Sequence, residues 1–466
     1  MLLVKGLVKV VSPLVSPGVV LTTALYGVLT LPAGCVGCQN PPQQPSLETL
    51  RLRVEKTPSD PLAHYRLAVA LYHYGRLSEA AKEFRKALAL KPDLVEAHNN
   101  LGVILDKEGK KGEALGEFNE AVKANPSDPD ARYNLAVALI RTQDDYLQAK
   151  RELEQAVRLN PKMSKAYYRL GQVDEHLGDL LQARRELEQA ITLNPQGNEV
   201  HFALANLLRK QGDRAAAEAQ LALFNQLKQQ ETNRDLATRA YRNGTLLAQR
   251  KEWDGAIEQF RKALELNPGL NVARFNLAGA LREKGDLEDA VRELRRVVQS
   301  SPKWTEARYE LGITLTRIGN LEEACREYHE VIRQDATLVA AYQGLAEALF
   351  LRGQTEAAEE ELRHILKLDP SNILARYTLA SYMLKQGRTS SVIAELQRVL
   401  RQNPEFAPGH NLLGIAYRQA GHTSMAVGEF QQAVRLDPAD SEAQTNLKLA
   451  LEQTNSQSEK QTNPGP

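Results

Sequence analysis

Side chains that could perform chemistry are few in this sequence and do not gather. Cys35 and Cys38 have the Cys-x-x-Cys spacing that supports thiol redox chemistry or metal binding, but they follow an apolar segment and have no further ligands beside them. The sequence contains no phosphate-binding glycine loop, no nucleophile elbow and no paired-histidine zinc motif. We therefore expect a protein that is not an enzyme and that uses no cofactor and no metal.

Four of the nine histidines could serve acid–base chemistry, yet they are spaced as a repeat rather than as a site. Each holds the fourth position of the repeating unit described below. We interpret them as half-buried packing side chains. They are His64, His98, His201 and His410.

The elements that position these residues come from an internal repeat. Prolines recur about every 34 residues, first at Pro58, Pro92 and Pro126 and last at Pro404 and Pro438. When this proline is set as position 32, eleven units follow one another over 61–440. They begin at Pro61, Val95, Pro129, Ser164, Asn198, Ala237, Asn271, Thr305, Val339, Ile373 and Ala407.

Within each unit the residue types are those of two closely packed helices. Position 7 is Leu in ten units, position 8 is Gly or Ala in all, position 20 is Ala in ten, and position 24 is large and apolar throughout. Small residues let two antiparallel helices approach where their axes cross, and larger ones would overpack the contact. Gly at position 15, present in nine units, can take positive φ and end the first helix. The proline at position 32 stops the second helix.

This pattern resembles the tetratricopeptide repeat (TPR). The resemblance implies an all-α fold, a right-handed superhelical solenoid of helix–turn–helix repeats, in which stacking buries the face that one repeat cannot bury alone. It also implies that positions 2, 5, 6, 9, 12 and 13 of the first helices face a concave, peptide-binding groove. The candidate groove residues are Tyr65, Asn100, Tyr133, Asn134, Tyr168, Asn206, Tyr241, Phe275, Asn276, Tyr309 and Tyr377.

Asparagine offers a donor and an acceptor to a peptide backbone. The Tyr-Asn-Leu-Ala run from Tyr133 and the Phe-Asn-Leu-Ala run from Phe275 resemble the TPR array of O-linked N-acetylglucosamine transferases, in which an asparagine ladder holds the substrate. Here the ladder is incomplete, because Ala203, Glu310 and Gly344 stand on other rungs. We expect a similar array without a catalytic domain.

Charge is balanced over the whole chain. Lysine plus arginine total 59 and aspartate plus glutamate total 58, for a net charge of +1, so no strong global field attracts nucleic acid. Basic residues at position 13, such as Lys107, Arg141 and Lys210, suit an extended or partly acidic peptide. We expect proteins or peptides as partners and no nucleic acid. The oligomeric state stays open.

The N-terminal segment has the features of an export signal. Lys5 and Lys9 precede residues 10–47, which carry no charge. The Leu-Pro-Ala-Gly-Cys stretch at 31–35 is similar to a lipoprotein cleavage box, which makes Cys35 a lipidation candidate, although Pro32 departs from the pattern. We expect an exported or membrane-anchored bacterial protein in the periplasm or at the cell surface. A plain cleaved signal and an uncleaved anchor are the alternatives to a lipoprotein.

The repeats divide the chain into segments. We expect a signal peptide or membrane anchor at 1–38, a linker at 39–45, a capping half-repeat at 46–60, repeats one to five at 61–231 and an insertion or hinge at 232–236. Repeats six to eleven follow at 237–440, then a capping helix at 441–454 and a disordered tail at 455–466.

Two functional hypotheses follow. The first is a non-catalytic scaffold that binds peptide segments or partner proteins in the concave groove and is associated with the cell envelope. The alternative is a substrate-recruiting or regulatory array for a separately encoded enzyme such as a glycosyltransferase. The N-terminal segment discriminates between them, because an exported array is separated from cytoplasmic nucleotide-sugar enzymes.

Overall fold

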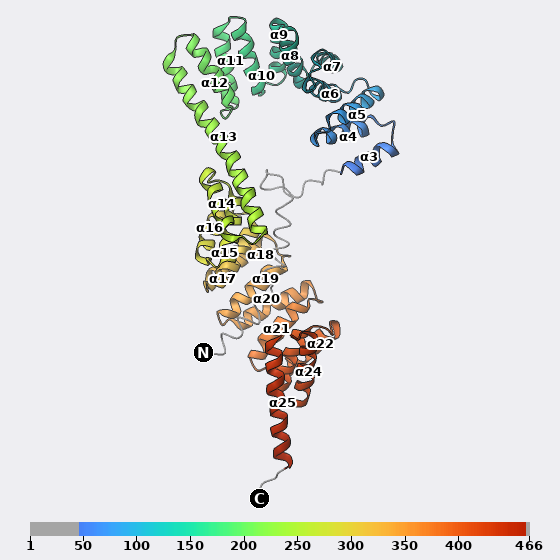
Figure 1. The fold of residues 1–466 in the computed structure, drawn as a ribbon, viewed down its shortest axis with the longest axis vertical. Helices are drawn as coiled ribbons and strands as arrows, with labels where there is room; N and C mark the ends of the chain where they lie inside the picture. The colour runs from blue at the N-terminus through green and yellow to red at the C-terminus, as the bar shows by residue number, and fades with distance from the viewer. Residues whose placement is uncertain (1–45, 463–466) are drawn as a thin grey trace. The chain divides into compact units, whose positions relative to one another are not determined.

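All regular structure in residues 46–462, the range described by the computed structural model, is helical (Figure 1), which confirms the predicted all-α fold. The helices are α3 (Leu47–Lys56), α4 (Pro61–His73), α5 (Leu77–Leu90), α6 (Val95–Lys107), α7 (Lys111–Ala124), α8 (Pro129–Gln143), α9 (Tyr146–Leu159), α10 (Ser164–His176), α11 (Leu180–Leu193), α12 (Asn198–Lys210), α13 (Arg214–Gln249), α14 (Trp253–Leu266), α15 (Asn271–Lys284), α16 (Leu287–Ser300), α17 (Thr305–Arg317), α18 (Leu321–Gln334), α19 (Val339–Leu351), α20 (Thr355–Leu368), α21 (Ile373–Lys385), α22 (Thr389–Gln402), α23 (Ala407–Gln419), α24 (Thr423–Leu436) and α25 (Ser441–Thr462).

The chain divides into two compact units, Met1–Leu227 and Lys228–Pro466, and the boundary falls within α13. Within each unit a helix packs against its neighbours in the sequence, and first helices of successive repeats also touch. Such contacts join α6 to α8 and α10 to α12 in the first unit, and α17 to α19 and α21 to α23 in the second.

Helix starts coincide with the repeat register. Ten of the eleven unit starts read from the sequence are the first residues of helices. Local chemistry explains some of them directly: Asp60 and Asp128 cap the helices that follow with their carboxylates, and Pro61 and Pro129 hold the first helical position, where no backbone donor is needed.

The close crossing of each helix pair depends on the small residue at position 8. A Cβ atom added to Gly102 would lie 2.7 Å from the ring of Phe118, and one added to Gly171 would lie 2.7 Å from the side chain of Leu187. Phe118 and Leu187 hold position 24 of the same repeats and are buried. The inferred contact between positions 8 and 24 is therefore present.

The turn at position 15 requires left-handed backbone. Nine glycines between Gly75 and Gly421 have positive φ, as the repeat pattern predicts. The two repeats without this glycine adopt the same conformation with Asp144 (φ 52°) and Lys251 (φ 61°). The geometry of the turn thus survives where the residue best suited to it is missing, at a cost of about 1 kcal/mol or more.

Two helices are longer than the sequence indicated. Residues 232–236, expected as an insertion or hinge, are helical, because α13 continues from the second helix of repeat five into the first helix of repeat six. This stretch is rich in Ala, Gln, Leu and Arg and contains no proline. The last helix, α25, runs on to Thr462 through residues expected to be disordered, which include several good helix formers.

A second recurring contact lies at position 4. In repeat two, Nδ1 of His98 is 2.7 Å from a carboxylate oxygen of Glu117 on α7, and Nε2 is 2.8 Å from the carbonyl oxygen of Pro92 in the preceding turn. In repeat three, Arg132 makes the same two contacts, to Glu152 and to the Pro126 carbonyl. We call this arrangement the position-4 clip, because it fastens one helix pair to the turn before it.

The clip places a side chain with two polar nitrogens between two acceptors. Arginine always has a donor for each acceptor, and the two ring nitrogens of a histidine face the same two groups. Burial opposes charge at Glu83, but hydrogen bonds from Lys86 and His64 still lower the pKa of that carboxyl group. The residues expected to be packing histidines are therefore polar bridges. Histidine forms the clip at His64, His98 and His410, and with Gln220 as partner at His201, and arginine forms it at Arg132, Arg274, Arg308 and Arg376.

The contact between positions 8 and 24 predicts that two Gly→Ala substitutions in the same repeat have opposite effects on stability. Gly102→Ala should destabilise the fold by about 1–3 kcal/mol, because the new Cβ atom meets the Phe118 ring. The matched control Gly116→Ala, in α7, adds a Cβ atom with nothing within 4 Å and should stabilise by about 0.4–1 kcal/mol. Thermal unfolding followed by circular dichroism measures both. Shifts of the same sign would contradict the register.

The clip generates a second prediction. His98→Ala should lower the free energy of unfolding by about 1–3 kcal/mol, because Glu117 and the Pro92 carbonyl lose their partner. His98→Arg should stay within about 1 kcal/mol of the parent, since arginine makes these contacts in four other repeats. Urea unfolding of the two variants measures both changes in the free energy of unfolding. If arginine proves as harmful as alanine, the histidine acts through its shape and not through the clip.

Candidate peptide-binding site

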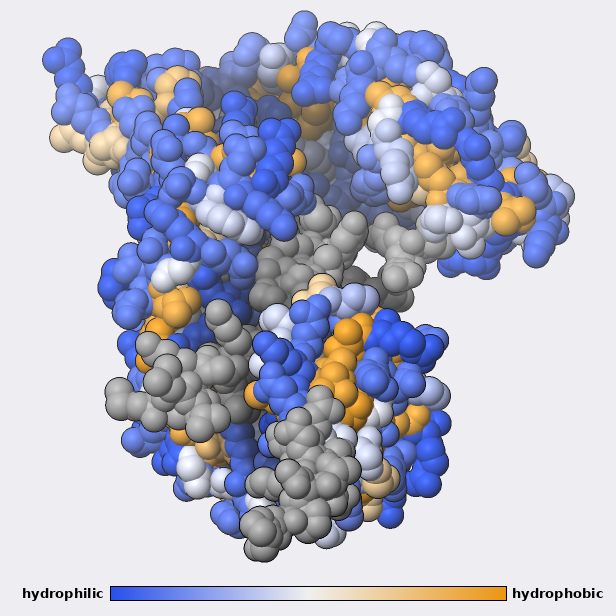
Figure 2. All heavy atoms as spheres, turned by 60° about the horizontal axis from the view of Figure 1, so that its bottom comes forward, coloured by the Kyte–Doolittle hydropathy of each residue, from blue (hydrophilic) through white to orange (hydrophobic). Residues whose placement is uncertain are grey.

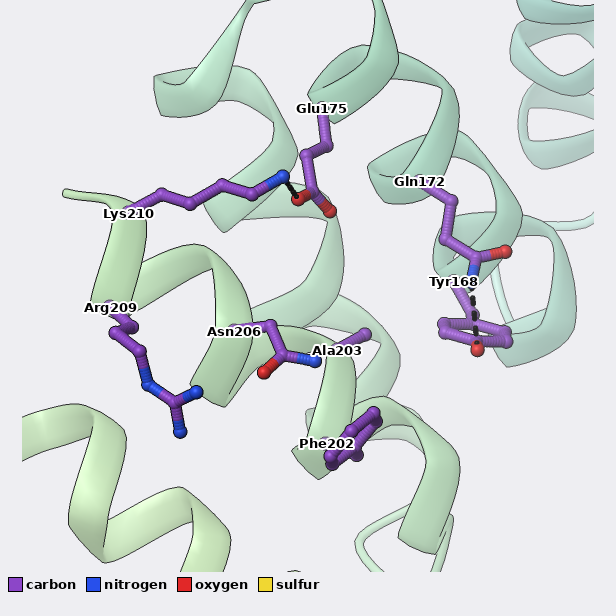
Figure 3. A pocket seen from close by; sticks show the side chains of 8 residues that line it. All are labelled: Tyr168, Gln172, Glu175, Phe202, Ala203, Asn206, Arg209 and Lys210. Carbon is purple, nitrogen blue, oxygen red and sulfur yellow. Dashed lines mark hydrogen bonds and ion pairs between the residues drawn. The ribbon is translucent and has the colours of Figure 1, made fainter.

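A hollow of 660 Å³ opens on the first helices of repeats four and five, within the first unit (Figure 3). Its volume is in the range that holds ligands and short peptide segments. Every residue around it belongs to α10 or α12 and holds position 5, 6, 9, 12 or 13 of its repeat. The lining residues are Tyr168, Gln172, Glu175, Phe202, Ala203, Asn206, Arg209 and Lys210.

One side of the hollow is internally bonded. Gln172 donates from Nε2 to the Tyr168 hydroxyl at 2.9 Å and accepts at Oε1 from Nη1 of Arg169 at 2.8 Å. Lys210 forms an ion pair with Glu175, and Figure 3 shows this lysine reaching from α12 across to α10. Burial is the main cause that raises the pKa of Tyr168, so its phenol stays neutral. These groups shape the wall and have their polar atoms largely engaged.

The other side presents a half-exposed aromatic ring and two polar side chains that are not engaged. Phe202, Asn206 and Arg209 follow one another along α12 at intervals of four and three residues, which places them on one face of the helix. Phe202 is 45% exposed, although its ring also packs 5.0 Å from that of Phe224. Within residues 46–462, the side chains of Asn206 and Arg209 have no hydrogen-bond or ion-pair partner. This stripe offers an apolar ring, an amide and a cation to a ligand.

The other groove candidates of the first unit are tied to one another. Asn100 lies 3.4 Å from the Tyr65 hydroxyl, and Asn134 donates to the side-chain oxygen of Asn99 at 3.3 Å. The Tyr133 ring lies under the ammonium group of Lys165, 4.7 Å from its centre. Each asparagine thus joins two successive first helices, which leaves less of its amide for a peptide.

The second unit repeats this arrangement and adds burial. Asn276 lies 3.3 Å from the Tyr241 hydroxyl, and the Phe275 ring packs against Trp304. Burial raises the pKa of both Tyr309 and Tyr377 to about 12, and Tyr377 is only 8% exposed. Tyr309 and Tyr377 therefore offer little surface to a ligand. Cys35, the lipidation candidate, lies outside the described residues.

Two charged side chains on first helices of the second unit are also engaged within the fold or buried. Arg282 on α15 forms ion pairs with Glu283 and with Glu310 on α17. Glu347 on α19 has its pKa raised by burial, against the opposing field of Arg317. The α12 face differs from these in presenting unengaged polar groups beside a hollow.

The histidine–glutamate pairs of the position-4 clip have the spacing of a general base and its orienting acid. Both nitrogens of each histidine ring are occupied, however, and arginine replaces the histidine in other repeats.

Among residues 46–462 no three metal-ligating side chains gather, and no helix there has the length and apolar content needed to span a bilayer. The face seen in Figure 2 is mostly hydrophilic, with apolar side chains in separate stripes.

Arg209 and the clip were not identified as sites from the sequence. A signal for Arg209 exists: it holds position 12, where repeats two and four carry the acids Asp106 and Glu175. Those acids pair with the basic residue at position 13 of the next repeat, Arg141 and Lys210. A basic residue at position 12 cannot form such a pair, but this signal does not single out Arg209, because Arg282 and Arg418 hold the same position.

Comparisons with known proteins agree on the repeat. A family model described as TPR repeat matches residues 70–109. Two models described as tetratricopeptide repeat match 99–145, 141–198 and 176–225, and 247–312, 315–382 and 349–416. The matches together cover more than half of the chain. No curated protein sequence matches it.

Solved structures with similar segments include MamA from Desulfovibrio magneticus RS-1, at 20% identity and a TM-score of 0.34 over 36% of this chain and 94% of that one. YrrB, a TPR protein with an unusual peptide-binding site, has 20% identity and a TM-score of 0.33 over 41% and 97%. The Cut9–Hcn1 hetero-tetramer of APC/C has 14% identity and a TM-score of 0.37 over 88% and 99%. The family matches and the repeated helix pairs show that the chain belongs to the tetratricopeptide repeat proteins.

Proposed function

We propose that this protein is a non-catalytic scaffold that binds a peptide segment of a partner protein in the hollow between α10 and α12. The observation that carries the proposal is the stripe of Phe202, Asn206 and Arg209, whose polar members are free within the described residues while the facing wall is bonded internally. A preformed wall costs little ordering on binding, and an unengaged amide can pair with a peptide backbone.

A peptide selection tests this proposal. Random peptides displayed on phage are selected on the purified chain, and the enriched peptides are measured against two double variants. Phe202→Ala/Asn206→Ala removes an aromatic anchor and an amide and should weaken binding about tenfold or more. The control Leu181→Ala/Asn225→Ala removes an exposed apolar side chain and an exposed amide outside the hollow, and it should leave peptide binding unchanged. Equal binding by both variants would remove the hollow from consideration.

Location is a separate part of the proposal. The basic residues Lys5 and Lys9 and the uncharged segment 10–47 support export, with the repeats in the periplasm or at the cell surface and Cys35 as a lipid attachment point. Cell fractionation of the full chain, with mass spectrometry of its N-terminus, tests it. A chain recovered from the cytoplasm with Met1 retained would favour the alternative of an array that recruits substrates to a separate enzyme, such as a glycosyltransferase.

A further inference from the structure

The three groups of the α12 stripe differ in chemistry, and their order is fixed. Phe202 is apolar, Asn206 lies one turn further along the helix, and Arg209 lies about one turn beyond that. A ligand that uses all three must therefore present an apolar group, a hydrogen-bonding backbone and an anion in that order. A single small group cannot meet both ends of the stripe.

The electrostatics of the hollow favour a negative ligand. Lys210 neutralises Glu175, so among the lining residues Arg209 is the cation that is left without a counter-charge. Beside the lining, Arg169 on α10 adds a second cation, and Glu199 on α12 is the acid whose field reaches Tyr168. The residues in and around the hollow thus sum to a net positive charge of one: three cations against two anions.

The length of the stripe sets a spacing for the ligand. Phe202 and Arg209 are seven residues apart, which in an α-helix is about 10 Å. A peptide in polyproline II conformation covers this distance in about three residues, at about 3.1 Å each, and its side chains three residues apart point to the same side. Asn206 lies between the two ends, where the backbone of such a segment would pass.

We propose that the hollow recognises an acidic peptide segment in which an Asp or Glu lies three residues from a large apolar side chain. The carboxylate pairs with Arg209, the apolar side chain packs on Phe202 beside Tyr168, and the intervening backbone bonds to the Asn206 amide. This proposal depends on the proposed function, because it specifies the partner of the same hollow.

An array of designed peptides tests it with the purified chain. Twelve-residue peptides with a Gly, Ser and Pro background carry Glu, Gln or Lys at one position and Leu, Phe or Ser at one to five residues from it. The strongest binding should come from Glu with Leu or Phe at a spacing of three. Replacing Glu by Gln, or moving the apolar residue next to it, should each weaken binding about fivefold.

A double-mutant cycle assigns the acidic preference to one residue. The dissociation constants of the Glu peptide and its Gln counterpart are measured by fluorescence anisotropy on the parent and on Arg209→Gln. The fivefold preference for Glu should vanish in Arg209→Gln. It should persist in the control Arg158→Gln, which removes an exposed arginine from α9, away from the hollow. A preference unchanged by Arg209→Gln would overturn the assignment.

The two proposals fail in different ways. If peptides with Gln or Lys bind as well as Glu peptides, and this binding is lost in Phe202→Ala/Asn206→Ala, the acidic motif is wrong while the hollow remains a peptide site. If neither the designed nor the phage-selected peptides depend on Phe202 and Asn206, the hollow is not a peptide site and both proposals fall.

Discussion

The distance between the two helices of each repeat is set where position 8 of the first meets position 24 of the second. At Gly102, Gly171, Gly244, Gly312 and Gly414 a Cβ atom would already collide with the large side chain opposite. Where alanine holds position 8, as at Ala68 and Ala136, that methyl group is fully buried. Because the first helices are held against their partners in this way, successive first helices within a unit form a face, and the hollow between α10 and α12 lies on that of the first unit.

Three groups of polar side chains can be distinguished on this scaffold. The position-4 clip engages one set at the turns, and pairs between successive first helices engage a second set, as with Asn100 and Tyr65 or Arg141 and Asp106. The third set has no protein partner among the described residues, and Asn206 and Arg209 belong to it. A polar group that the fold does not use is available to a ligand, which is why the third set marks the candidate site better than residue type alone.

The sequence predicts the repeat closely because the repeat depends on local rules. Proline and aspartate at helix starts, glycine at position 15 and small residues at position 8 each act within a few residues or one helix pair, so eleven copies make the register plain. What it does not show are contacts between repeats. Asn134 and Tyr377 have the residue types of groove contacts, but the first bonds to Asn99 and the second is buried.

Two other differences have the same kind of cause. The continuity of α13 follows from helix formers that fill an insertion, where a gap in the repeat pattern suggested a break. The turn conformation of Asp144 and Lys251 is imposed by the helix pairs on either side, which override the preference of those two residues for negative φ.

The clip also bears on how the chain unfolds. In a repeat array, cooperativity comes from the coupling between neighbouring repeats as well as from the stability of each one. The clip supplies part of this coupling, because it ties each repeat that has it to the turn that precedes that repeat. Gln444 extends it to α25 through the Pro438 carbonyl, while Tyr342 keeps only the bond to the turn. Ala240 has no side chain to form it and lies inside α13, where no turn precedes it. The nearest-neighbour coupling is therefore uneven: repeats four and six, with Tyr167 and Ala240 at position 4, lack this contribution, whereas repeats three, five and seven have it.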